Sequence, residues 1–115
     1  MNIDAPFAVH VAPQHDGARL VLSGRVDRDA EDDLLAAFVA ASEPGTARVV
    51  LDFGDTTYIN SSGLAAIVAL LADARKRDIA VVARSLTGHY RHLFEITRLT
   101  DLIEVEPAPE PGASA

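Results

Sequence analysis

The chain has 115 residues, and its 10 Lys and Arg residues against 17 Asp and Glu residues give it a formal net charge of −7 at pH 7. An acidic chain repels phosphate groups, so we expect neither nucleic acid nor an anionic membrane surface as a partner. Its length and its 49% hydrophobic content suit one domain with one core. The absence of cysteine excludes disulfides, thiolate metal sites and cysteine nucleophiles.

No segment of the sequence is long and apolar enough to cross a bilayer. The longest apolar run, Leu64–Ala72, has nine residues, whereas a span needs about 20. The first residues, Met1–Phe7, lack the basic flank and the apolar stretch of a secretory signal. We therefore expect a cytoplasmic protein that does not insert into a membrane.

The N-terminal part of the sequence predicts a hairpin of two strands. Apolar residues alternate along Phe7–Val11, and Arg19–Ser23 is a second strand-like run. The turn residues Asp16–Gly17 lie between them. We therefore expect the first strand to pair antiparallel with the second.

Acidic residues in the segment 27–33 precede the first predicted helix. Asp27 or Asp29 can cap this helix, because a carboxylate oxygen there accepts a hydrogen bond from an unpaired amide. The predicted apolar face of the helix consists of Leu34, Leu35, Phe38 and Val39. We expect the helix to end near Pro44–Gly45.

The middle of the chain predicts a buried strand followed by the strongest helix. Arg48–Phe53 contains consecutive apolar residues, as in an interior parallel strand that is covered on both faces. The next residues, Gly54–Asn60, are predicted to form a loop. Basic residues at 75–77 suit the C-terminus of the following helix. Its predicted apolar face consists of Leu64, Ile67, Val68, Leu71 and Ala74.

The last part of the chain continues the alternation of strand and helix. We predict a strand at Ile79–Ala83, a helix at Leu86–Ile96 and a final strand at Leu102–Val105. The order ββαβαβαβ implies an α/β fold with about five strands in a mostly parallel, mixed sheet and three main helices, with the antiparallel strand at one edge. We assign residues 1–106 to the domain and expect residues 107–115, which are rich in proline, to form a disordered tail.

The most informative stretch is Tyr58–Leu64, a polar turn between the buried strand and the strongest helix. Ser61 is expected to lie within one residue of the helix N-cap. Either Ser61 or Asn60 can simply cap the helix by accepting a hydrogen bond from an unpaired amide. Alternatively, unpaired amides and the helix dipole favour an anion, so this position can accept a phosphate on Ser61 without loss of the fold.

Two motifs in the sequence resemble those of the STAS domain of anti-sigma factor antagonists. Leu22–Asp27, with the sequence LSGRVD, is similar to the LTGELD of that family, which precedes the first helix. Asn60–Leu64, with the sequence NSSGL, is similar to the family's DS[ST]GL. The resemblance extends from about Phe7 to Val105, which is nearly all of the predicted domain.

The resemblance implies a regulatory binding module with no catalytic residue, no metal and no cofactor. In the family, the serine that follows the aspartate is phosphorylated by a partner that is both anti-sigma factor and serine kinase, and a phosphatase reverses the modification. Ser61 matches that serine. The unphosphorylated antagonist binds the anti-sigma factor and frees the sigma factor, and we expect the free chain to be a monomer. The residues expected to bind the partner are Asp27, Asn60, Ser61, Ser62 and Gly63.

The sequence departs from the family's pattern at three positions. Asn60 replaces the usual aspartate, which keeps the size and the capping ability but removes a negative charge. Arg25 stands where the family often has glutamate. Arg98 stands in place of a glycine, so the glycine that favours a left-handed turn after the third helix is missing, and we expect the end of that helix to differ.

Other chemistries have weaker support in the sequence. A serine hydrolase needs a nucleophile elbow, but Ile59–Gly63 lacks the first glycine of GxSxG. His89 and His92 have the spacing of metal ligands, and either could act as a base, but we expect them on a solvated helix face. The acidic segment 27–33 lacks the pattern of a calcium loop. A closer alternative uses the same fold, because STAS domains also serve as subunits of lipid-transporting ABC complexes.

Overall fold

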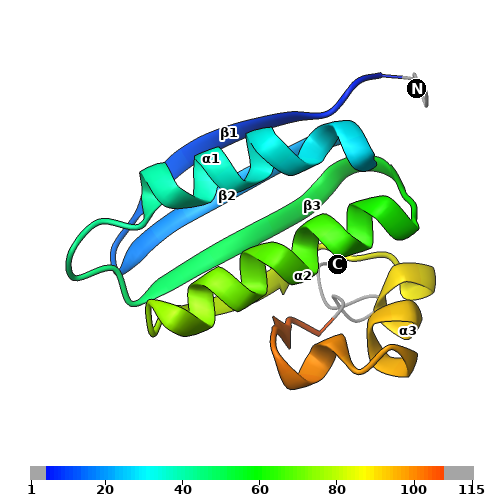
Figure 1. The fold of residues 1–115 in the computed structure, drawn as a ribbon. Coiled ribbons are helices and arrows are strands. Elements are labelled where there is room, and N and C mark those ends of the chain that lie inside the picture. The colour runs from blue at the N-terminus through cyan, green and yellow to red at the C-terminus, as the bar shows by residue number, and fades with distance from the viewer. Residues whose placement is uncertain (1–4, 108–115) are drawn as a thin grey trace, which may run out of the picture.

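The centre of the structure is a mixed sheet whose strand order, β1-β2-β3-β4-β5, follows the chain. The computed structural model describes residues 5–107, and Figure 1 shows its strands behind two long helices. The strands are β1 (Ala8–Gln14), β2 (Gly17–Val26), β3 (Arg48–Ile59), β4 (Ala80–Arg84) and β5 (Glu104–Val105). β1 pairs antiparallel with β2 at one edge, and the other neighbours pair in parallel. The predicted order ββαβαβαβ and the antiparallel edge strand are confirmed.

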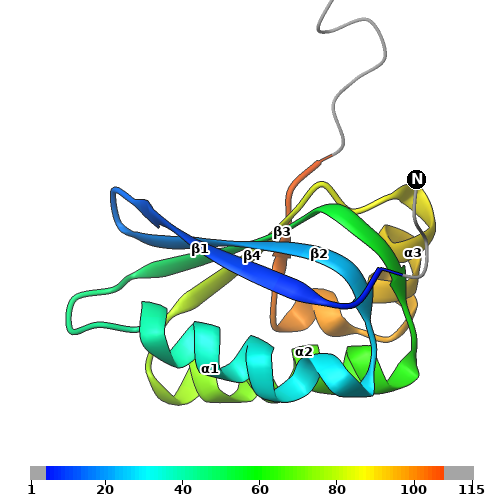
Figure 2. The ribbon, with the colours of Figure 1, turned by 90° about the horizontal axis from the view of Figure 1, so that it is seen from above.

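The helices cover one face of the sheet and one end of it. They are α1 (Glu31–Ala41), α2 (Ser61–Lys76) and α3 (Gly88–Ile96), with the 3-10 turns η1 (Arg28–Ala30) before α1 and η2 (Leu99–Asp101) after α3. Seen from above in Figure 2, α1 and α2 lie on the same side of the sheet. The hydroxyl of Tyr90 in α3 accepts a hydrogen bond from the amide of Ile59 at 3.0 Å, which places α3 beside the end of β3.

Two further predictions concern the ends of the chain and membranes. Residues 108–115, which make up most of the predicted tail, lie outside the described residues, as do residues 1–4. Within residues 5–107, no helix combines the length and the apolar content that a bilayer crossing requires.

Strict alternation along β2 turns one row of residues toward α1 and α2. Residues 18, 20, 22, 24 and 26 are buried, and the residues between them are partly exposed. The helix side chains in the same core include Leu34, Phe38, Ile67 and Leu71, which are at most 2% exposed. Full burial of such side chains contributes about 1.5–3 kcal/mol each, so the layer between sheet and helices is the main source of stability.

Two residues that the sequence analysis assigned to apolar helix faces lie outside the core, so this assignment was wrong. Val39 is 49% exposed and Val68 is 41% exposed. Each directly follows a buried residue, Phe38 or Ile67, and is therefore rotated by about 100° away from the core. Because every residue from Gly63 to Ala72 is apolar, spacing alone does not define the buried face of α2.

The predicted loop at Gly54–Asn60 is also wrong, because β3 continues to Ile59. β2 is longer than predicted and supplies partners for this extension, with Arg25 opposite Tyr58 and Val26 opposite Ile59. Two register shifts between the strands accommodate the irregular segment. The extension carries both strands to the start of α2.

The ends of the other elements differ from the prediction by a few residues. α1 ends at Ala41 rather than near Pro44–Gly45. α3 begins at Gly88 because Thr87 caps it, with its hydroxyl oxygen 3.4 Å from the amide nitrogen of Tyr90.

The segment after α3 also departs from expectation. The final strand has only two residues, because η2 occupies Leu99–Asp101 before it. Arg98 itself adopts the left-handed conformation, with φ of 63°. The left-handed turn after α3 therefore forms with arginine in place of glycine.

Candidate functional site

Asn60 caps α2. Its side-chain Oδ1 accepts a hydrogen bond from the amide of Gly63 at 2.9 Å, and its carbonyl accepts one from the amide of Leu64, also at 2.9 Å. Ser61 is the first residue of the helix, which confirms the prediction that it lies within one residue of the N-cap. Of the two candidate caps, the structure therefore selects Asn60.

Ser61 is exposed, as is its neighbour Ser62. Within residues 5–107, the hydroxyl of Ser61 forms no hydrogen bond, since Asn60 provides the cap. The first amides of a helix have no partner inside it, and the positive end of the helix dipole lies there. A phosphate on Ser61 would therefore lie in solvent beside favourable groups and leave the cap intact.

Gly63 is buried and brings the start of α2 against the end of β2. A Cβ atom at this position would overlap the carbonyl oxygen of Val26 and lie 2.6 Å from its carbonyl carbon. The same carbonyl accepts a hydrogen bond from the amide of Asn60 at 3.2 Å. Because only glycine allows this approach, Gly63 has a structural role in addition to its predicted role in partner binding.

Asp27 begins the turn that leads into α1. Its carboxylate accepts a hydrogen bond from the amide of Asp29 at 3.0 Å and lies 3.6 Å from the guanidinium of Arg25. Of the two acidic cap candidates, Asp27 is thus the cap, although it caps η1 rather than α1. The carbonyl of Val26, directly before Asp27, accepts the hydrogen bond from the amide of Asn60, directly before Ser61. Asp27 and Ser61 therefore lie at the same edge of the sheet.

The site is acidic on its α1 side. Glu31, Asp32 and Asp33 occupy the first turn of α1, next to the turn that Asp27 caps. Carboxylates at this position stabilise the positive end of the helix. A partner that approaches this edge therefore meets carboxylates on one side and two exposed hydroxyls on the other.

Two tyrosines near the site were missed by the sequence analysis. Tyr58 is 45% exposed and lies opposite Arg25 on the neighbouring strand. The hydroxyl of Tyr90 accepts a hydrogen bond from the amide of Ile59, which directly precedes Asn60, the cap of α2. The Tyr90 contact joins residues 31 positions apart, so no local pattern indicates it. Tyr58 could have been found by its strand alternation, had this part of β3 been recognised as a strand.

The residues considered as metal ligands or catalytic bases lie on exposed helix surfaces or at helix starts. His89 and His92 are exposed on α3, as predicted for a solvated helix face. Residues 27–33 form the cap of η1 and the first turn of α1. Among the residues that the structure describes, no group of three or more His, Asp or Glu side chains is arranged to hold a metal ion.

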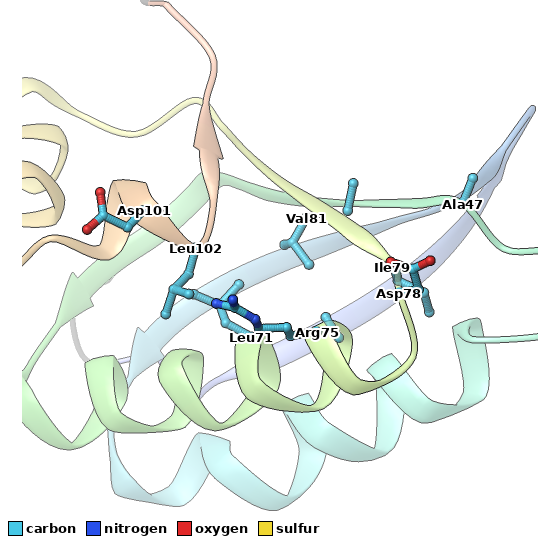
Figure 3. A pocket seen from close by; sticks show the side chains of 10 residues that line it. Ala47, Leu71, Arg75, Asp78, Ile79, Val81, Asp101 and Leu102 are labelled. Atoms are coloured by element: carbon cyan, nitrogen blue, oxygen red, sulfur yellow. The ribbon is translucent and has the colours of Figure 1, made fainter.

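A cavity of about 420 Å³ lies at the opposite end of α2 from Ser61 (Figure 3). Its lining comes from the end of α2, the start of β4 and η2, and includes Leu71, Arg75, Val81 and Leu102. None of the residues predicted to bind a partner lines it. The candidate site instead presents the exposed Ser61 and Ser62 on the surface, which suits a protein partner better than a small molecule.

The sequence is similar to one known family over most of its length. A family model described as "Mlab, STAS domain" matches residues 9–104. BtrV of Bordetella bronchiseptica, which is assigned to the anti-sigma factor antagonists by name, is 32% identical over 94 residues. The match covers 82% of this chain and 81% of that protein.

Solved structures of anti-sigma factor antagonists share the fold. The crystal structure of one from Mycobacterium paratuberculosis has a TM-score of 0.69 at 20% identity, over 90% of this chain and 87% of that one. The Bacillus cell fate determinant SpoIIAA in the phosphorylated form has a TM-score of 0.65 at 14% identity, over 89% of this chain and 92% of that one. At these identities the similarity is one of fold.

Proposed function

Because the chain belongs to the STAS domain family of anti-sigma factor antagonists, we propose that it binds an anti-sigma factor and thereby frees a sigma factor. The chain acts in the cytoplasm, performs no reaction itself and needs no cofactor. Its contact surface is the edge formed by Asp27, Asn60, Ser61, Ser62 and Gly63.

The observation that carries this proposal is the exposed hydroxyl of Ser61 at the first residue of α2. Because Asn60 caps the helix, modification of Ser61 does not remove a cap. The proposed partner is an anti-sigma factor with serine kinase activity. It transfers the γ-phosphoryl group of ATP to the Ser61 oxygen, which loses its proton, and ADP leaves. A phosphatase hydrolyses the phosphoserine and restores the hydroxyl.

Phosphorylation of Ser61 weakens binding to the partner in this proposal. A phosphate adds a charge of about −1.5 to −2 to an edge that already holds Asp27 and the acidic first turn of α1. This charge loses hydration when the partner covers it. We expect binding to weaken by at least about tenfold, which corresponds to about 1.4 kcal/mol. A phosphorylated structure of SpoIIAA, which shares this fold, supports the compatibility of the fold with such a modification.

Calorimetric titration with the candidate anti-sigma kinase tests the proposal. Ser61→Ala should bind like the unmodified chain and resist phosphorylation, whereas Ser61→Asp should bind at least about tenfold more weakly. Thr100→Asp is the charge-matched control, because Thr100 is exposed on η2 and away from the site. Ser62→Ala controls for the position of the modified serine, since this variant should still be phosphorylated at Ser61. Equal affinities for the unmodified chain and Ser61→Asp, with phosphate mapped elsewhere, would reject the switch.

The same measurements separate the alternatives. A chain that binds the ATPase of a lipid-transporting ABC complex and no anti-sigma factor would instead be a subunit of such a complex. A hydrolase would show esterase activity that Ser61→Ala abolishes. Neither result is expected.

A further inference from the structure

The outer surfaces of α1 and α2 form one uncharged face, which we call the outer helix face. It consists of the exposed residues Ala36, Val39 and Ala40 of α1 and Ala65, Val68 and Ala72 of α2. Figures 1 and 2 show the two helices side by side on the same side of the sheet. Within residues 5–107, these side chains have no covering element.

An uncharged outer face is unusual for a helix at a protein surface. Every residue of α2 from Gly63 to Ala72 is apolar, although 23% of the chain is charged. A surface helix normally carries polar residues opposite its core face, and a helix that is apolar on all sides is normally buried on all sides. The composition of α2 therefore indicates that its outer side is also covered.

Val39 and Val68 form the apolar centre of the outer helix face. Both helices start at the same end of the molecule, on the right in Figure 1. Counted from Glu31 and Ser61, the two valines lie about 12 Å and about 10 Å along their helices at 1.5 Å per residue. Because α2 also contacts η1, its start lies beside the turn before α1, so the two valines are offset along neighbouring helices but belong to the same outer helix face.

The two ends of the outer helix face carry opposite charges: the start of α1 is acidic, and the end of α2 is basic. Asp32 and Asp33 are exposed in the first turn of α1, and Arg75 and Lys76 are exposed in the last turn of α2. Among residues 5–107, none of these four side chains has an ion-pair partner. The acidic end and the basic end are both free to meet another molecule.

We propose that the outer helix face binds a second copy of this chain. The two copies would be related by a two-fold axis that lies in the plane of the face and crosses both helices obliquely. The acidic first turn of α1 in each copy then meets the basic last turn of α2 in the other copy. Val39 and Val68 then lie near the axis and lose their contact with water. The face is therefore complementary to itself in charge and in its apolar centre.

The size of the face suits a weak dimer. α2 has 16 residues and is about 24 Å long, and two packed helices are together about 20 Å wide. The footprint is therefore about 480 Å² per copy, or about 1,000 Å² in total, which is near the lower limit for a specific interface. We expect a Kd on the order of 10–100 μM, so that dilute protein is monomeric.

Sedimentation equilibrium of the full chain from about 5 μM to about 1 mM, with no partner present, tests the proposal. The chain should change from monomer to dimer across this range. Val68→Glu should raise the Kd at least about tenfold, because the dimer would bury an unpaired carboxylate. Ile96→Glu is the matched control and should leave the Kd unchanged, since Ile96 is exposed at the end of α3. Circular dichroism checks folding, and Val39→Glu provides a second variant.

Charge reversal tests the complementarity separately. Asp32→Lys alone and Lys76→Asp alone should each weaken the dimer, and the two together should restore it, because the contact is then reversed rather than lost. A chain that stays monomeric at the highest concentration overturns the proposal, as does a dimer that both valine variants leave intact. Because the measurement uses one protein, its outcome is independent of binding to an anti-sigma factor.

Discussion

Replacing Gly63 with alanine should force the start of α2 away from the end of β2. The added Cβ atom would overlap the carbonyl oxygen of Val26 and lie 2.6 Å from its carbonyl carbon, and these backbone atoms cannot rotate aside as a side chain can. α2 therefore has to shift. The shift lengthens the hydrogen bond from the amide of Asn60 to the Val26 carbonyl, which is 3.2 Å in the structure, and disturbs the cap that Asn60 provides.

Three contributions determine the size of the effect. Overpacking of a close contact costs about 1–3 kcal/mol. Loss of the Asn60 cap costs about 1 kcal/mol. Alanine favours a helix over glycine by about 1 kcal/mol, which offsets part of this loss. We therefore expect Gly63→Ala to lower the free energy of unfolding by about 1–3 kcal/mol.

Urea unfolding followed by circular dichroism measures this change, with Gly88→Ala as the matched control. Gly88 also starts a helix, but nothing lies within 4 Å of a Cβ added there. Alanine at Gly88 should raise the free energy of unfolding by about 0.4–1 kcal/mol. If Gly63→Ala proves as stable as Gly88→Ala, the close approach of α2 to β2 is refuted, and so is the contact that holds Asp27 and Ser61 at the same edge of the sheet.

Three further expectations can be checked by unfolding measurements. Asn60→Ala should lower the free energy of unfolding by about 1 kcal/mol and Ser61→Ala by less than about 0.5 kcal/mol, since only Asn60 caps α2; equal losses in urea unfolding would contradict this assignment. Arg98→Gly should raise the melting temperature, because it relieves the left-handed backbone at φ of 63° by about 1 kcal/mol, and an unchanged or lower value would show that this turn carries no strain. Glu106→Gln should cost about 0.5 kcal/mol at neutral pH. Two hydrogen bonds from Arg84, of 2.9 and 3.1 Å, lower the pKa of Glu106, so its contribution is present above the ordinary pKa of glutamate and disappears as the pH falls through the lowered value. A difference between Glu106→Gln and the unmodified chain that persists in acid would show that the ion pair is not its cause.

The order of strands and helices could be predicted because, in most elements, the spacing of apolar residues alone distinguishes a strand from a helix. The consecutive apolar residues of Arg48–Phe53 are typical of an interior strand, and the structure places them there. The second half of β3 could not be predicted, because Gly54–Tyr58 contains mainly polar residues and forms a strand only where β2 offers it partners. The exposure of Val68 could not be predicted either, since α2 is apolar on all sides.

The position of the candidate site could be predicted from local motifs, but the role of each residue depends on contacts between distant segments. The motif places Ser61 at the start of α2, and only the geometry shows that Asn60 is the cap. Gly63 is part of the same motif, and its burial against Val26 becomes visible only when β2 and α2 are placed together. The left-handed Arg98 shows the limit of the rule that such a turn needs glycine, because the chain adopts this conformation at a local backbone cost of about 1 kcal/mol.

Asn60→Asp separates the capping role of Asn60 from the effect of a negative charge at the same position. Aspartate caps a helix as well as asparagine does, so the hydrogen bond from the amide of Gly63 should remain. The added negative charge at the positive end of α2 contributes about 0.3–1 kcal/mol. Asp27 lies at the same edge and opposes this gain, but Arg25, 3.6 Å from Asp27, offsets part of its charge. We therefore expect a net gain in stability at neutral pH.

Thermal unfolding of Asn60→Asp and the unmodified chain at neutral and at acidic pH measures this gain. The gain requires a charged carboxylate, so it should be present at neutral pH and disappear when acid protonates the new side chain. The unmodified chain is the reference at each pH, because its amide cap does not titrate. A variant that is less stable at neutral pH would mean that repulsion from Asp27 outweighs the attraction of the helix end, and asparagine at this position would then be required by the acidic edge around it.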